Sequence, residues 1–93
     1  MTPHLNLING QWTAADSYSP NTNPSDLSDL IGAYAQGGAS DVQAAVAAAA
    51  AAFPAWSTSG IQARSDALDK IATEILARKA ELGELLAREE GKT

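Results

Sequence analysis

The sequence contains no cysteine, and its first 63 residues contain neither lysine nor arginine. Without cysteine, disulfide bonds, thiolate metal sites and thiol nucleophiles are excluded. The missing basic side chains, and a net charge of -5, argue against nucleic acid or an anionic membrane as a partner. No apolar run reaches the roughly 18 residues of a membrane span, and Met1-Thr2-Pro3-His4 has no secretory n-region. We therefore expect a cytoplasmic protein.

Large apolar side chains are also scarce. Hydrophobic residues make up 45% of the chain, but alanine fills twenty of those positions. A chain of this length buries only about 60–65% of its unfolded surface. Burial of methyl groups gives little free energy to offset the roughly 1–2 kcal/mol of backbone conformational entropy that each residue loses on folding. The composition therefore favours part of a larger structure over a self-sufficient domain.

The first 35 residues carry strand signals. Asn9-Gly10 separates two short apolar runs and predicts a β-hairpin, because this pair accepts the positive φ angles of a type I′ turn. Residues 16–28 form a polar connection with two prolines, and Leu30–Ala35 predicts one further strand. Residues 1–35 should therefore form a hairpin, a polar connection and a strand.

Residues 40–53 predict a first helix. Ser40 and Gln43 have the spacing of a capping box, alanine then dominates, and Pro54 should end the helix after Phe53. Its larger side chains fall on one face, but the remaining surface is methyl rather than charged. A helix without a polar face is usually covered on more than one side.

Residues 58–91 predict a second helical region with an apolar stripe and a charged outer face. Three acids stand four residues before a base: Asp66–Lys70, Glu74–Arg78 and Glu84–Arg88. Gly83 favours a kink or break between about Arg78 and Gly83, and Gly91 should end the helix. Since the connection over residues 54–59 is short, we expect the two helices to form an antiparallel hairpin.

No catalytic constellation can be assembled from these residues. His4 lies in a terminus that we expect to fray. Two acid pairs are present, Asp66 with Asp69 and Glu89 with Glu90. Each is typical of a solvated helix face with basic neighbours. Gly32, Gly37 and Gly38 lack the spacing of a dinucleotide fingerprint, and Gly91-Lys92-Thr93 lacks the upstream glycine of a phosphate loop. We predict no catalytic, cofactor-binding or metal-binding residue.

Three stretches of this chain resemble motifs of one protein family, and they occur in the same order as in that family. Ile8-Asn9-Gly10-Gln11-Trp12 resembles the N-terminal hairpin motif of the aldehyde dehydrogenase superfamily. Asn23-Pro24 and the run from Asp41-Val42 to Phe53-Pro54-Ala55-Trp56 are similar to its next segment. Leu86-Ala87-Arg88-Glu89-Glu90-Gly91-Lys92 is similar to the helix that ends in the family's E-x-G-K. Residues 23–29 and 60–64 look most like members that oxidise 2-oxoglutarate semialdehyde.

The resemblance implies a segment of an α/β cofactor-binding domain in a parent enzyme that oxidises an aldehyde to a carboxylic acid with NAD or NADP. The family's cysteine nucleophile and glycine-rich cofactor segment have no counterpart here. Some relatives bind a monovalent cation, and the resemblance would put its ligands at Asn21, Thr22 and Glu89. We make no prediction for that site, because the carbonyl ligands are not specified by side-chain identity.

Two functional hypotheses follow. The first is a non-catalytic N-terminal fragment of an NAD(P)-dependent aldehyde dehydrogenase, mainly α with a short N-terminal hairpin and one further strand. Its partner would be the remainder of the parent chain, or a second copy through exposed apolar faces, and it would bind no cofactor alone. The alternative is a free-standing alanine-rich helical module that binds a partner protein.

Overall fold

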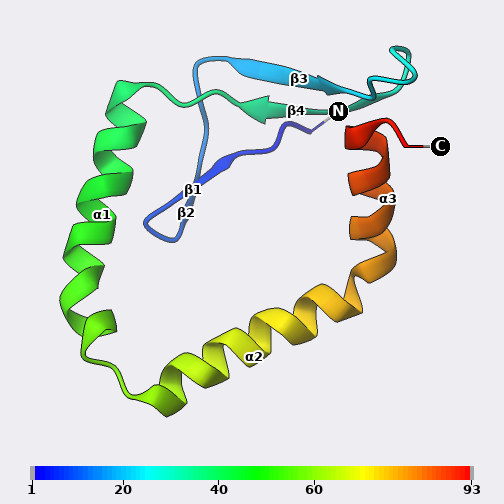
Figure 1. The fold of residues 1–93 in the computed structure, drawn as a ribbon. Helices are drawn as coiled ribbons and strands as arrows, with labels where there is room; N and C mark the ends of the chain where they lie inside the picture. The colour runs from blue at the N-terminus through cyan, green and yellow to red at the C-terminus, as the bar shows by residue number, and fades with distance from the viewer. Residues whose placement is uncertain (1, 93) are drawn as a thin grey trace.

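The computed structural model describes residues 2–92 and shows four short strands followed by three helices (Figure 1). The strands are β1 (Asn6–Ile8), β2 (Gln11–Thr13), β3 (Tyr18–Thr22) and β4 (Leu30–Ala35). The helices are α1 (Ala39–Ser57), α2 (Ile61–Ala77) and α3 (Lys79–Glu90). They run around an open ring that returns α3 to the strands. The predicted mainly helical class is confirmed, although two strands rather than one follow the hairpin.

The hairpin of β1 and β2 forms as predicted. Its turn residues Asn9 and Gly10 have φ angles of 52° and 72°, as a type I′ turn requires. Ile8 faces Gln11 across the turn, and the antiparallel register continues to Asn6 and Thr13.

β4 also forms as predicted, but its partner β3 lies inside the stretch that the sequence predicts to be a polar connection. The two strands are antiparallel, with Pro20 opposite Ala33 and an irregularity between Asn21 and Thr22. Proline is tolerated because β3 is an edge strand, in which the N–H positions on the open side need no ladder partner. The polar residues and prolines therefore led the sequence analysis to predict a connection where a strand forms. That strand is stabilised by pairing rather than by burial.

His4 does not fray, contrary to the prediction. Its backbone forms a parallel bridge beside β4: its N–H donates to the carbonyl of Ala33, and its carbonyl accepts from the N–H of Ala35, each at 2.8 Å. The imidazole stacks on the Tyr34 ring at a centroid distance of 4.5 Å. A Cβ at Gly32 would lie 3.2 Å from both rings, so glycine leaves room for the stack.

The start of α1 differs from the predicted capping box. Gly38 rather than Ser40 is the N-cap, and the Asp41 carboxylate accepts a 2.9 Å hydrogen bond from the Gly38 N–H. A carboxylate is favoured there because it meets the positive end of the helix dipole. The helix therefore begins one residue before Ser40.

Pro54 does not end α1, which runs on to Ser57. Proline removes one intrahelical donor, but the carbonyl of Pro54 gains several partners in the last turn. The hydroxyls of Ser57 and Thr58 donate to it at 3.1 and 2.8 Å, and the Thr58 N–H does so at 3.3 Å. These bonds extend the helix for one turn beyond the proline.

The second helical region breaks at Arg78, which is the first residue of the interval predicted for the break. Arg78 separates α2 from α3 with φ -107° and ψ 17°, whereas Gly83 lies within α3. The break is therefore not at Gly83, and the prediction that this glycine causes it is wrong. Arg78 donates to Glu81 at the start of α3, which replaces the predicted pair with Glu74. Asp66 accepts a hydrogen bond from Gln62, and Arg88 forms its ion pair with Asp29, so neither of the other two predicted pairs closes as an ion pair within residues 2–92.

The predicted antiparallel pairing of α1 with α2 is wrong. Figure 1 shows the two helices diverging from the link at residues 58–60, and they do not pack along their lengths in the described part of the chain. A methyl-rich face gains little by burial, since the hydrophobic term scales with the area removed from water. The short link therefore does not bring the helices together. No helix within residues 2–92 is long and apolar enough to cross a membrane.

Candidate functional site

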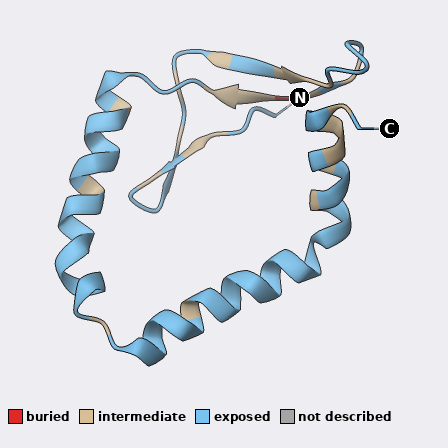
Figure 2. Ribbon diagram, in the orientation of Figure 1, coloured by how far each residue is buried: buried red, intermediate tan, exposed pale blue. Residues whose placement is uncertain are grey.

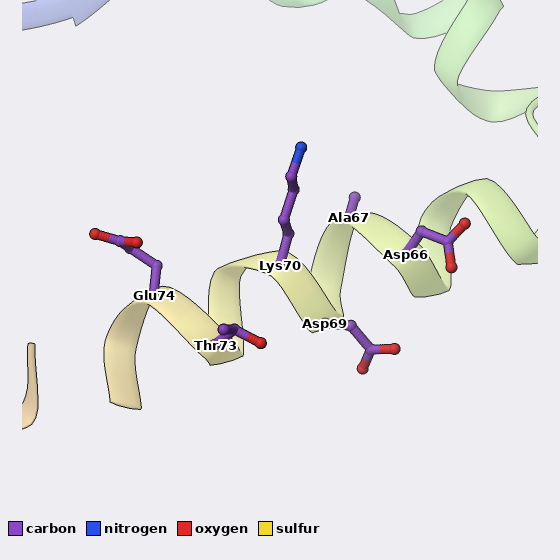
Figure 3. Close-up of a pocket in the computed structure, with 6 residues that line it drawn as sticks. All are labelled: Asp66, Ala67, Asp69, Lys70, Thr73 and Glu74. Carbon is purple, nitrogen blue, oxygen red and sulfur yellow. The ribbon is translucent and has the colours of Figure 1, made fainter. Parts of the chain in front are cut away.

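The acid pair Asp66 and Asp69 lines a shallow hollow along α2 (Figure 3). Every lining residue comes from this one helix: Asp66, Ala67, Asp69, Lys70, Thr73 and Glu74. The close-up shows their side chains spreading away from the helix axis in different directions. A hollow of this kind leaves the carboxylates solvated, so it does not provide the enclosed geometry that acid–base catalysis uses.

The turn from β4 into α1 is the described feature that most resembles a phosphate site, because Gly37 and Gly38 stand between a strand and a helix. Two observations oppose that role. The Gly38 N–H is already bonded to the Asp41 carboxylate, whose charge would repel a phosphate. β4 is paired antiparallel with β3, not within a parallel sheet. The turn does not fit the pyrophosphate of NAD or NADP.

Metal-binding residues are not gathered in the described chain, where no three His, Asp or Glu residues are placed to hold an ion. The resemblance would assign cation ligands to Asn21, Thr22 and Glu89. The first two end β3, and Glu89 lies in the last turn of α3. These segments approach the same corner through neighbouring residues, but no side-chain hydrogen bond or ion pair within residues 2–92 joins Glu89 to either.

That corner holds the best-defined polar cluster, at the turn between β3 and β4. The guanidinium of Arg88 donates two hydrogen bonds to the Asp29 carboxylate, Nε to Oδ2 at 3.0 Å and Nη2 to Oδ1 at 2.6 Å. The Asn23 amide also donates to Oδ2, at 3.3 Å. We call Asp29, Arg88 and Asn23 the corner cluster; it joins residues 59 positions apart.

A second contact lies beside the corner cluster. The Ser25 hydroxyl donates to the carbonyl of Gly91, the residue that ends α3. Gly91 has a φ of 74°, and the N–H groups of Gly91 and Lys92 donate to the carbonyls of Arg88 and Ala87, which is a Schellman motif. The end of α3 is thus fixed against the turn by both side-chain and backbone groups. Thr93 of the phosphate-loop comparison lies outside the described residues.

The hydrogen bonds from Arg88, and then the one from Asn23, hold the pKa of Asp29 below its ordinary value. A lowered folded-state pKa adds stability that is complete above the unfolded-state pKa and is lost as the pH falls through the folded-state value. We therefore expect the carboxyl carbon of Asp29 to titrate, by NMR, at lower pH than in a peptide of residues 23–31. Equal midpoints in the chain and the peptide would contradict this contact.

Apolar side chains on the helices remain exposed. Phe53 on α1 and Leu68 on α2 are each 66% exposed, and none of the hydrophobic residues in the described chain is buried (Figure 2). The exposed set also includes Val42, Val46, Trp56, Ile61, Ile71, Ile75 and Leu76. Extended apolar surface is typical of an interface with other protein. The predicted apolar faces are therefore present but uncovered.

Comparison with known proteins decides the family. The profile of the aldehyde dehydrogenase family matches residues 12–93. The chain belongs to this family. The match begins inside the hairpin and covers β3, β4 and all three helices of the described structure.

Several curated aldehyde dehydrogenases are similar to this family member. N-succinylglutamate 5-semialdehyde dehydrogenase of Chromobacterium violaceum is 41% identical over 92% of the chain and 18% of that enzyme. Alpha-ketoglutarate semialdehyde dehydrogenase of Haloferax volcanii is 36% identical over 97% of the chain and 19% of that enzyme. 2-Aminomuconic semialdehyde dehydrogenase of Bos taurus is 33% identical over 95% and 18%. The chain spans less than a fifth of the length of these relatives.

Sequence reasoning missed the corner cluster and the Ser25–Gly91 contact. It assigned Arg88 to Glu84, one helical turn away, because local spacing is visible in a sequence and a partner 59 positions away is not. One local signal was available: the N–H of Ser25 donates to the side chain of Asn23 at 2.9 Å, the turn that Asn-Pro-Ser favours. The Asn23 side chain also donates to Asp29, and Ser25 donates to Gly91 at the end of α3.

Proposed function

We propose that this member of the aldehyde dehydrogenase family is an N-terminal segment of an NAD(P)-dependent enzyme, where it builds part of the cofactor-binding domain. Its role there is structural, and its partner is the remainder of the dehydrogenase chain. Family membership and the small share of each relative that it matches support this role. Cytoplasmic placement is part of the same proposal, supported by the absence of cysteine.

The observation that carries the proposal is the absence of any buried hydrophobic residue in the described chain. Val42, Val46 and Phe53 of α1 are each at least 60% exposed on a helix whose other positions are mostly alanine. Small side chains allow close approach of a neighbouring helix or sheet, and such approach is useful only when the neighbour is present. These faces fit covering elements of the same dehydrogenase.

The chemistry of the proposed enzyme would lie outside these residues. Aldehyde oxidation in this family uses a cysteine nucleophile, and this sequence has none. NAD or NADP would accept the hydride when bound to the whole enzyme. Within the described chain, the β4–α1 turn does not fit its phosphates, because Asp41 occupies the Gly38 N–H. The segment alone therefore neither oxidises an aldehyde nor binds the nucleotide.

The proposed substrate class is a semialdehyde, an aldehyde that carries a carboxylate elsewhere in the molecule. The three relatives named above each act, by name, on a semialdehyde. Within this class we favour 2-oxoglutarate semialdehyde, because residues 23–29 and 60–64 resemble members with that substrate and the Haloferax volcanii enzyme is 36% identical.

A segment exchange tests the proposal. Placing this chain in the Chromobacterium violaceum relative, in place of its matching segment, should give a soluble enzyme that reduces NAD or NADP with a semialdehyde. Phe53→Asp should abolish that activity because it puts a charge on a face that must be covered, whereas the exposed, polar-face variant Thr73→Asp should retain it. The unmodified segment alone should show no nucleotide binding by calorimetry.

Two outcomes would overturn the proposal. One is saturable micromolar binding of NAD or NADP by the segment alone. The other is a soluble but inactive exchanged enzyme, which would favour the alternative of a free-standing helical module. In that case the exposed alanine-rich face of α1 would bind a separate protein partner rather than the rest of a dehydrogenase.

A further inference from the structure

One face of α2 is apolar along nearly its whole length. Its members, which we call the α2 stripe, recur at helical spacing and are 53% to 81% exposed: Ile61, Leu68, Ile71 and Ile75. The stripe spans about 20 Å of helix. In the described chain α2 packs extensively against no element other than α3. Such a stripe is typical of a helix that faces other protein.

The opposite face of α2 is polar and carries the shallow hollow described above. Lys70 and Thr73 lie on that side, together with the acidic residues of the hollow (Figure 3). Thr73 follows Ile71 by two residues, which places it nearly opposite on a helix of 3.6 residues per turn. The helix therefore has one face suited to protein and one suited to water.

Arg64 lies within the stripe and indicates the chemistry of what covers it. It lines a second shallow hollow together with Ile61 and Leu68. Within residues 2–92 no ion pair or side-chain hydrogen bond holds its guanidinium. A charge that other protein covers must be paired, because an unpaired buried charge is costly. The covering surface should therefore be apolar, with a carboxylate or carbonyl oxygen opposite Arg64.

The described chain is too open to provide that cover itself. The radius of gyration of its Cα atoms is 16.9 Å, whereas a compact domain of this length has about 12 Å. A second copy is a poor candidate, because it would bring a further net charge of -5. The curated relatives offer a better one. The chain matches 18% and 19% of two of them, so more than four fifths of each lies outside this segment.

We propose that the α2 stripe is a docking face for the remainder of the dehydrogenase chain, which covers it with an apolar surface that pairs with Arg64. The hollow side of α2 stays in water. This inference rests on the proposed function and adds to it the face of α2 that is buried and the chemistry of its partner.

Hydroxyl-radical footprinting of the exchanged enzyme tests the docking face. Oxidation of leucine and isoleucine side chains is followed by mass spectrometry, with the denatured enzyme as the reference for each position. Leu68 and Ile71 should be oxidised several-fold more slowly in the native enzyme than in the denatured one. Thr73→Leu places a reporter on the hollow side, and that side chain should be oxidised at nearly its denatured rate.

Matched substitutions provide a second readout in the same enzyme. Ile71→Asn should remove most of the soluble, active enzyme, because it buries an amide without a partner. Thr73→Asn introduces the same side chain on the hollow side and should leave yield and activity unchanged. Arg64→Gln should lower the temperature of thermal inactivation more than Lys70→Gln does, although each variant loses one positive charge.

Failure of this inference is distinguishable from failure of the proposed function. If the exchanged enzyme is active but Leu68 and Ile71 are as reactive as in the denatured chain, the docking face is refuted while the proposed function stands. Equal protection of Leu68 and the Thr73→Leu side chain would refute the one-sided burial. Protection that disappears when the subunits dissociate on dilution would assign the stripe to a second copy. An exchanged enzyme that remains insoluble would overturn both proposals, because the stripe then finds no cover.

Discussion

Replacing Gly91 with alanine is expected to destabilise the end of α3 by about 1–3 kcal/mol, the range for a non-glycine residue held in an unfavourable backbone region. The φ of 74° is accessible to glycine at no steric cost. A Cβ would also lie 2.6 Å from the Ser25 hydroxyl oxygen and 2.8 Å from Cγ of Pro24. Amide hydrogen exchange should therefore show reduced protection of the Lys92 N–H, which donates to Ala87.

Gly83→Ala is the matched control for this prediction. Gly83 lies inside α3, and a Cβ there would meet no atom within 4 Å. Because alanine loses less backbone entropy than glycine in a helix, this variant should stabilise α3 by about 0.5–1 kcal/mol. The same substitution is thus expected to have opposite signs eight residues apart. Equal effects at the two positions would contradict the role assigned to the Gly91 turn.

The features that the sequence predicted correctly are those that depend on the conformational preferences of neighbouring residues. The Asn9-Gly10 turn and β4 depend on preferences of a few adjacent residues, and both formed at the expected positions. The helices were also expected, because alanine content and apolar periodicity act over one or two turns. The aldehyde dehydrogenase resemblance was confirmed, because the family profile matches residues 12–93.

Pairing between distant residues accounts for most of the errors. β3 contains a proline and polar residues, yet it forms because β4 provides its partner. His4 is ordered for the same reason, through backbone bonds to Ala33 and Ala35. The continuation of α1 past Pro54 depends on hydroxyl donors that follow the proline, and a rule for proline alone ignores them.

The candidate site was predictable only in part. The absence of cysteine is read directly from the composition, and it excludes the thiolate chemistry of the family from these residues. The corner cluster was not predictable from the sequence, because Arg88 already has an acidic neighbour one helical turn away at Glu84. Its pairing with Asp29 depends on how the helices return α3 to the strands. Only the three-dimensional arrangement brings these charges together.

The 93-residue chain on its own is expected to be helical by far-UV circular dichroism but to unfold without a sharp transition. Cooperative unfolding requires a shared core, and none of the hydrophobic residues in the described chain is buried. If the chain does not melt broadly, it should associate through its exposed apolar faces, which would make the melting temperature depend on protein concentration. Thermal scans at several concentrations, with sedimentation at each, separate these two results from a stable monomer.

Ala49→Leu extends this prediction to the assembled enzyme. Ala49 is exposed on α1, so a larger side chain meets no neighbour and should change the stability of the isolated chain little. If the rest of a dehydrogenase covers α1, the same change should overpack that contact and cost about 1–3 kcal/mol in the exchanged enzyme. A sharp, concentration-independent melt of the isolated chain would mean that half-buried contacts at the sheet and corner suffice for folding. The uncovered α1 face would then no longer require the rest of a dehydrogenase.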